Sequence, residues 1–210
     1  MDIEVLGLTE TARRRPFTSP DLYLHDRAIL AQLAADLREL LDRGRHVKPY
    51  EPIEWTLDGL KRRVIVCDPV ALRGGIVDVS MVGFFGERNL DRDGAPLEEA
   101  NAEIVLEFRN YPGILSYSST ELADGNWANL VLHDKPDTRE YWRASHRHAQ
   151  AAEHLSPLYY RTVRIHNGVL PGGLYGERPV LIERTKYWDF GGRKMWRAVR
   201  ELPPLAATTG

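Results

Sequence analysis

Residues 114–133 read ILSYSSTELADGNWANLVLH, and this stretch decides the fold. Two runs rich in apolar, β-branched and aromatic residues, Ile114–Glu121 and Trp127–His133, are typical of strands. Between them stands Ala123-Asp124-Gly125-Asn126, a combination that favours a tight turn. The stretch therefore predicts an antiparallel hairpin, and the neighbouring elements can be placed around it.

One strand and one helix are expected on each side of this hairpin. Before it, Ile76–Phe85 is β-rich and mostly apolar, and a helix follows from about Asp93 to Asn110. After it, a helix from Asp137 to about His154 precedes a fourth strand, Tyr159–Val169. The order strand, helix, strand, strand, helix, strand predicts an α+β fold of the ferredoxin-like βαββαβ type, with both helices on one face of an antiparallel sheet.

Segments on both sides extend this unit. Residues 1–74 are expected to pack on it as an arm, a helix and a connector that contains one short strand, Lys61–Cys67. The helix spans about residues 20–43, because apolar residues recur there at helical spacing: Ile29, Leu33, Leu37 and Leu40. Within residues 75–210, the ferredoxin-like domain, the tail adds a further strand over Pro179–Trp188.

A ferredoxin-like unit leaves one sheet face without helices, and an apolar face of that size needs a cover. The 20–43 helix, the tail strand or a second copy of the chain could supply it. We predict a homodimer, since an obligate pair would bury on the order of 1,000 Å² or more on such a face.

The composition argues against several classes of function. Lys and Arg total 28 against 30 Asp and Glu, a net charge of −2, whereas a nucleic-acid binder needs a basic surplus. The single cysteine, Cys67, can form neither an internal disulfide nor a cysteine-based zinc site. No apolar run approaches the roughly 18 residues of a membrane span, and the start Met1-Asp-Ile-Glu lacks the basic residues of a signal peptide. We expect a cytoplasmic protein that binds neither membrane nor nucleic acid.

The 137–154 helix carries the residues best suited to chemistry. At about 100° per residue, its inward face combines small residues with two aromatics: Tyr141, Trp142, Ser145, Ala149 and Ala152. His148 lies at the edge of that face. Neighbouring strands add polar residues that alternate with apolar ones: Tyr117, Asn129, His133, Arg164 and His166. One imidazole above a space lined by small and polar side chains predicts a ligand pocket. The alternative is a hydrogen-bonded core histidine.

Zinc and haem differ in what they would require of His148. Tetrahedral zinc needs converging ligands, but His146 and His148 face different ways on the helix, so no metal site is expected. Haem needs only one axial histidine above an apolar slot, so His148 qualifies as a haem ligand and haem remains a possible cofactor.

Three segments together resemble the dimeric α+β barrel superfamily, and within it the antibiotic-biosynthesis-monooxygenase-like proteins. They are the strand Asn126–His133, the helix motif Tyr141-Trp142…Ser145…His148-Ala149, and the strand Tyr159-Tyr160…Val163…Ile165…Gly168. The resemblance covers about residues 75–170. It implies two sheets that face each other across a dimer, with a pocket between each sheet and its helices. Residues before 75 and after Gly173 depart from the family's basic unit and could cap that pocket.

The family includes cofactor-free oxygenases, haem enzymes with a histidine on or near the second helix, cyclases and lyases, and proteins without known activity. The resemblance implies that Trp142 and His148 are pocket residues and that Asn129 is the polar group on the facing strand. We therefore expect a small-molecule enzyme of monooxygenase-like type that acts on an apolar aromatic or enolisable substrate.

In this hypothesis His148 is the general base or a hydrogen-bond donor, and Asn129 and Arg164 are the other catalytic groups, Arg164 holding a developing oxyanion. The remaining pocket residues bind the substrate: Tyr117, Trp142, Tyr141, Ser145, His133 and His166. Two alternatives stay open, a haem-dependent oxidoreductase or lyase and a non-catalytic dimer that binds a small hydrophobic molecule.

Overall fold

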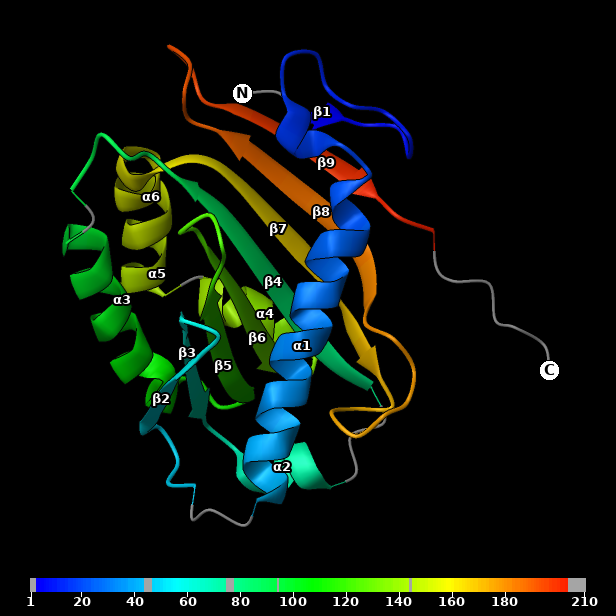
Figure 1. Ribbon diagram of the computed structural model, residues 1–210, viewed down its shortest axis with the longest axis vertical. Coiled ribbons are helices and arrows are strands. Elements are labelled where there is room, and N and C mark those ends of the chain that lie inside the picture. Colours follow the sequence, from blue (N-terminus) through cyan, green and yellow to red (C-terminus); the bar gives the residue numbers. More distant parts are fainter. Residues whose placement is uncertain (1–2, 44–46, 75–77, 94, 144, 204–210) are drawn as a thin grey trace.

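The computed structural model describes residues 3–43, 47–74, 78–93, 95–143 and 145–203. Its strands form one nine-stranded sheet: β1 (Glu4–Val5), β2 (Pro52–Leu57), β3 (Leu60–Val66), β4 (Asp78–Arg88), β5 (Ile114–Glu121), β6 (Trp127–His133), β7 (Tyr160–Pro171), β8 (Leu181–Asp189) and β9 (Trp196–Glu201). The strand order is β1-β9-β8-β7-β4-β6-β5-β3-β2 (Figure 1). All neighbours are antiparallel except β1 and β9, which are parallel.

The helical segments are α1 (Leu22–Asp42), α2 (Pro69–Arg73), α3 (Ala95–Glu107), α4 (Pro136–Arg143), α5 (His146–Gln150), the π-helical segment η3 (Ala151–Leu155) and α6 (Ser156–Tyr159). Two 3-10 turns, η1 (Pro16–Thr18) and η2 (Phe108–Asn110), complete them. No described helix has both the length and the apolar character needed to cross a membrane.

The centre of the sheet has the predicted ferredoxin-like arrangement. The chain runs β4, α3, β5, β6, α4 to α6 and β7, and these four strands lie in the order β7-β4-β6-β5. The fourth strand of the unit therefore pairs with the first, and the third lies between the first and the second. The predicted hairpin is β5 and β6, with Gly125 in the left-handed conformation at its turn (φ 77°).

The sheet is larger than the predicted unit. On one edge β3 pairs with β5 and carries β2, so the expected connector is a hairpin, closed by Asp58 and Gly59 with φ of 52° and 79°. On the other edge β8 is the predicted tail strand, and β9 and β1 extend the sheet beyond it. Segments from before and after residue 75 thus share one sheet. Ile76 and Val77, the predicted start of the first core strand, lie outside the described residues.

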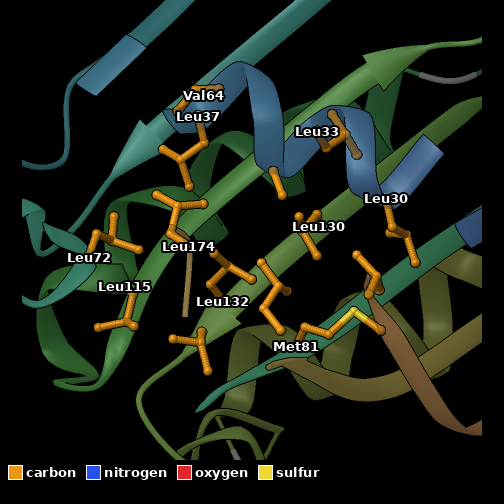
Figure 2. Packing of buried hydrophobic residues seen from close by; sticks show 14 of the residues in the cluster. Leu30, Leu33, Leu37, Val64, Leu72, Met81, Leu115, Leu130, Leu132 and Leu174 are labelled. Carbon is orange, nitrogen blue, oxygen red and sulfur yellow. The ribbon is translucent and has the colours of Figure 1, made fainter. Parts of the chain in front are cut away.

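The helix predicted over residues 20–43 is α1, with small shifts of its ends, and of the three possible covers for the sheet face opposite α4 it is the one that the structure has. Figure 2 shows its leucines pointing onto the strands, where they meet side chains of β4 and β6. The contact buries, among others, Leu30, Leu33, Leu37, Met81, Leu130 and Leu132, none more than 2% exposed. Because α1 fills this face, the reason for predicting a sheet-to-sheet homodimer no longer holds.

One glycine allows this close approach. A Cβ atom at Gly83 would lie 2.7 Å from Cδ2 of Leu30, a distance that real Cβ contacts do not show. The strand therefore presents bare backbone where α1 crosses it. A side chain at this position would require the buried side chain of Leu30 to shift.

The predicted helix over residues 137–154 is wrong as a single element. Helix α4 ends at Arg143, and α5 starts at His146 with Ser145 in an extended conformation (φ −62°, ψ 138°) as its N-cap. Beyond η3, Ser156-Pro157 opens a further short helix, α6, because proline fits the first turn of a helix. The inward face deduced for one continuous helix therefore does not extend past residue 145.

We predict that Leu37→Ala lowers the free energy of unfolding by about 2 to 5 kcal/mol, because it removes a buried side chain and leaves a cavity beneath α1. Leu37 is 0% exposed. Leu24→Ala on the same helix is the matched control, since Leu24 is 63% exposed, and it should cost less than about 0.5 kcal/mol. Denaturant unfolding followed by circular dichroism measures both. Equal losses would contradict the placement of α1.

Candidate functional site between the sheet and the helices

The strand register sorts the predicted site residues onto two faces of the sheet. Asn129 lies opposite Phe84, and Tyr117 lies opposite Val131. These positions face α3 to α6, because Val131 and Tyr117 pack in the same cluster as Trp142 of α4. His133 alternates with Val131 along β6 and faces the same way. We name the space between this sheet face and α3 to α6 the helix-side layer.

Arg164 and His166 do not belong to this layer. They lie opposite Phe85 and Gly83 on β4, and Gly83 is the residue that contacts Leu30 of α1. Their assignment to the pocket is therefore wrong. Because β7 carries polar residues on both faces, the alternation of side chains along the strand could not show which face points toward the helices.

On the α1 face, Arg164 and His166 share the buried carboxylate of Asp26 from α1. The guanidinium of Arg164 donates from Nε and Nη2 at 2.8 and 2.9 Å, and Nε2 of His166 lies 2.9 Å from Oδ2 of Asp26. Burial alone would raise the pKa of Asp26, but the hydrogen bonds and charges of His166 and Arg164 outweigh it and hold that pKa below its usual value. Asp26 is thus an ionised carboxylate with its charge paired.

The helix-side layer is packed as two separate apolar clusters. One gathers around Trp142 over β3, β5 and β6, and the other gathers around Tyr160 over β4 and β7. Gly86 makes room for the second, since a Cβ there would lie 2.3 Å from the ring of Tyr160. Asn129 stands at the border, opposite Phe84 of the second cluster and Ser119 of β5. The α1 face, by contrast, carries one large apolar core.

Several polar atoms on this sheet face are buried without a partner among the described residues. They are the hydroxyls of Ser80 and Ser119, Nδ1 of His133 and Nδ2 of Asn167. Ser80 lies opposite His133, and Asn167 lies opposite Val82, the next residue on the same face as Ser80. Buried polar atoms normally have a hydrogen-bond partner, so this group invites water or a ligand.

His148 is half-buried at the edge of this layer. Its ring lies 5.4 Å from that of Trp142, edge to face, and its main-chain N donates to Oγ of Ser145 at 3.1 Å. Burial and the positive charge of Arg143 lower the pKa of His148 below its usual 6.5. The imidazole is therefore neutral at pH 7 and can accept a proton.

His133 is 1% exposed at the end of β6. Burial, helped by the charge of Arg139, lowers the pKa of His133 to about 4, although Asp134 opposes the shift. This second imidazole is neutral at every pH at which the protein is expected to work, and its Nδ1 is one of the unpartnered atoms.

Two predicted substrate-binding residues have other roles in the structure. The hydroxyl of Ser145 accepts the hydrogen bond that caps α5, so it organises the turn between α4 and α5. Tyr141 is 64% exposed and packs on Tyr111 at 5.4 Å, outside the layer. Trp142, in contrast, is buried and contacts Phe108 and Tyr111 at 5.2 and 4.8 Å.

The two described cavities contain no haem slot beside His148. The imidazole packs against Trp142, and neither of the two described cavities is lined by His148. Within the part of the chain that the structure describes, no three His, Cys, Asp or Glu side chains lie together as a metal site would require. The buried thiol of Cys67 packs in the Trp142 cluster, and burial raises its pKa to about 12.

Sequence reasoning missed Ser80, Ser119 and Asn167 in this layer. A polar residue inside an apolar strand, such as Ser80 in Asp78–Arg88, was the available signal. It also missed the π-helical segment η3, which lies between α5 and α6 beside α3. Such segments are frequent at functional sites.

No protein-family model matches the chain, and no curated protein matches it in sequence. Solved structures are similar to part of the chain. A protein from Shewanella oneidensis, SO0527, has a TM-score of 0.41 at 11% identity, over 47% of this chain and 96% of its own. The cofactor-independent oxygenase SnoaB of Streptomyces nogalater has a TM-score of 0.35 at 18% identity, over 45% and 92%.

An aldoxime dehydratase is similar over a longer stretch, 69% of this chain and 36% of its own, with a TM-score of 0.30 and 13% identity. At these identities and scores the comparisons transfer no residue roles.

We predict that stability falls as the pH is lowered from about 6.5 to about 4, because the unfolded chain protonates His133 there and the folded chain does not. Between pH 7.5 and 5.0 this single imidazole should cost about 2 kcal/mol of unfolding free energy. His133→Gln keeps a polar side chain without the proton uptake, so its loss over the same range should be smaller by about that amount. His154→Gln, at an exposed position, is the control. Denaturant titrations at the two pH values decide, and parallel losses in all three proteins would refute the assignment.

Proposed function

We propose that this protein is a small-molecule enzyme of the monooxygenase type, which holds an apolar, aromatic and enolisable substrate in the helix-side layer. The divided packing of that layer carries the proposal: two apolar clusters, rich in aromatic side chains, flank a sheet surface on which buried polar atoms lack partners. An aromatic substrate would pack on the clusters, and its oxygen atoms would supply the missing hydrogen bonds.

His148 is the general base in this proposal. Its lowered pKa keeps the imidazole unprotonated at pH 7, so it can take a proton from an acidic C–H or O–H group. The ring of Trp142 packs against the imidazole of His148, and the hydrogen bond from the main-chain N of His148 to the N-cap Ser145 fixes the main chain at residue 148. The base is therefore held in place before the substrate arrives.

The substrate anion is stabilised by neutral donors. Arg164, the predicted oxyanion group, is committed to Asp26 on the other face. Asn129 takes this role instead, because its side-chain amide lies on the helix-side face at the border of the two clusters. Tyr117 lies on the neighbouring strand, with its ring 5.9 Å from that of Phe108, and would stack on the substrate.

The reaction needs molecular oxygen and no external reductant. Removal of a proton from a CH₂ group beside a carbonyl gives an electron-rich enolate, which O₂ oxidises. The CH₂ becomes a second carbonyl, one oxygen atom enters the product, and the other leaves as water with the two hydrogens. The resemblance of the Asn126–His133 strand and the Tyr141–Ala149 motif to monooxygenase-like proteins supports an oxygenase reaction.

We predict that the protein consumes oxygen with anthrone, an apolar, aromatic and enolisable ketone, and that His148→Ala lowers the rate about a hundredfold or more, the usual contribution of a positioned base. An oxygen electrode measures the rate, and chromatography identifies the quinone product. His154→Ala is the matched control, since His154 is exposed in the neighbouring segment η3, and it should keep the activity of the original protein.

Melting curves of both variants separate a catalytic from a structural role. If His148→Ala melts several degrees lower while each folded molecule keeps its activity, His148 is a core residue and the proposal fails. If anthrone binds, as measured by quenching of tryptophan fluorescence, but no oxygen is consumed, the layer is a binding site without this chemistry.

A further inference from the structure

A cavity lies on the face of the sheet opposite the helix-side layer. Its volume is about 190 Å³, and it is enclosed by the N-terminal part of α1, the segment before α1, and strands β7 to β9. Leu8, Leu22 and Leu202 supply an apolar part. Asp26, Arg164, His166, Thr185, Tyr187 and Arg200 supply a polar part. None of these residues belongs to the helix-side layer or to the proposed oxygenase reaction.

Arg200 is the most unusual member of this group. It is 3% exposed, and its Nε donates to the carbonyl of Gly7 at 3.0 Å, while Nη2 donates to the carbonyls of Glu10 and, at 3.0 Å, of Thr18. No Asp or Glu side chain of the described residues forms an ion pair with it. A buried positive charge without a counter-charge is costly.

The hydroxyl of Tyr187 extends this charge toward the cavity. Nη1 of Arg200 donates to it at 2.7 Å. The same hydroxyl has a hydrogen bond with the side chain of Thr185, and because Thr185 donates its own hydrogen to His166, the phenol hydrogen points at Thr185. An anion in the cavity would take this O–H donor, which is polarised by the guanidinium behind it, in place of Thr185.

The other charged groups of the cavity do not neutralise the positive charge of Arg200. The Asp26 carboxylate is paired with Arg164 through two hydrogen bonds. Because Asp26 can only accept, Nε2 of His166 carries the hydrogen, and Nδ1 accepts from the Thr185 hydroxyl at 2.8 Å. Burial lowers the pKa of His166 against the effect of Asp26, so the imidazole is neutral. Two guanidinium groups and one carboxylate leave a net charge of one.

We propose that this cavity binds a small monoanion, a carboxylate joined to an apolar group no larger than one ring. The carboxylate would accept from Tyr187 and neutralise the charge of Arg200, and the apolar group would contact the leucines. A neutral ligand leaves the buried charge unpaired, and a dianion leaves a negative charge in its place. The volume lies below the roughly 300 Å³ at which ordinary ligand pockets begin, which limits the size.

The direct test is a titration with 4-fluorobenzoate, observed by fluorine NMR, beside the neutral 4-fluorobenzamide. We expect saturable binding of the benzoate, with the amide at least about tenfold weaker, the effect of losing a charge-assisted hydrogen bond. Equal affinity of the two compounds would overturn the proposal. So would a lack of saturation at about 10 mM 4-fluorobenzoate, a concentration on the order of the weakest specific dissociation constants.

Variants locate the bound benzoate. Tyr187→Phe removes the donor and keeps the ring, so the dissociation constant should rise about tenfold. Leu22→Trp fills the apolar part of the cavity and should abolish binding. This variant tests the proposal independently if Tyr187→Phe does not fold. The control is Arg13→Gln with Arg14→Gln, which lie with Arg161 along a separate, open groove. If this control loses binding while the two cavity variants keep it, the anion binds in the groove and the proposal is wrong. Melting curves without ligand check that each variant is folded.

Discussion

The packing of α1 against the sheet is the contact on which the other features depend. Leu30 reaches the backbone of β4 at Gly83, and Leu33 and Leu37 extend the contact over the neighbouring strands. Each fully buried leucine contributes about 2 kcal/mol, a large part of the 5 to 15 kcal/mol that keeps a domain folded. With α1 in place, both faces of the sheet are covered. The face that a ferredoxin-like unit could offer to a second copy is used within the chain.

This packing also explains the buried charges. A helix laid across a sheet brings its polar residues into the interior along with its leucines, and Asp26 is one turn from Leu30 on the buried side. A carboxylate there needs partners, which Arg164 and His166 supply from β7. The polar network is thus a consequence of the contact between α1 and the sheet. Removing one member would leave the others buried and unpaired.

Much of the fold was predictable because its signals are local. The hairpin at Gly125, the apolar strand β4 and the leucine spacing of α1 each follow from neighbouring residues. The strands β2 and β9 were missed because Glu54 and Arg197 interrupt their apolar pattern, although each pairs with the predicted strand next to it in the sequence, β3 or β8. The break after α4 was missed because the sequence around Ser145 has helical composition. There the cap on α5 outweighs propensity.

The site was predictable only in part, for a geometrical reason. Helical spacing brought Trp142 and His148 to one place, and the structure has their rings in contact across the break between α4 and α5. Strand alternation says that His166 and Ile165 point to opposite faces, but not which face is which. In a sheet covered on both sides that choice depends on the whole assembly. Asp26 and the unpartnered Ser80 are recognisable only once their surroundings are known.

The surroundings of His148, the base of the proposed reaction, limit the substrates that this proposal allows. Arg143 and burial both disfavour a proton on His148, so this imidazole is a weaker base than a histidine in water. Proton transfer to a weak base is efficient only when the donor is already acidic. An ordinary ketone or alcohol is too weak an acid, whereas a CH₂ group whose anion is delocalised over aromatic rings is much stronger. The same apolar surroundings that weaken the base would bind those rings. Burial of His148 therefore favours aromatic, enolisable substrates on two independent grounds, acidity and contact.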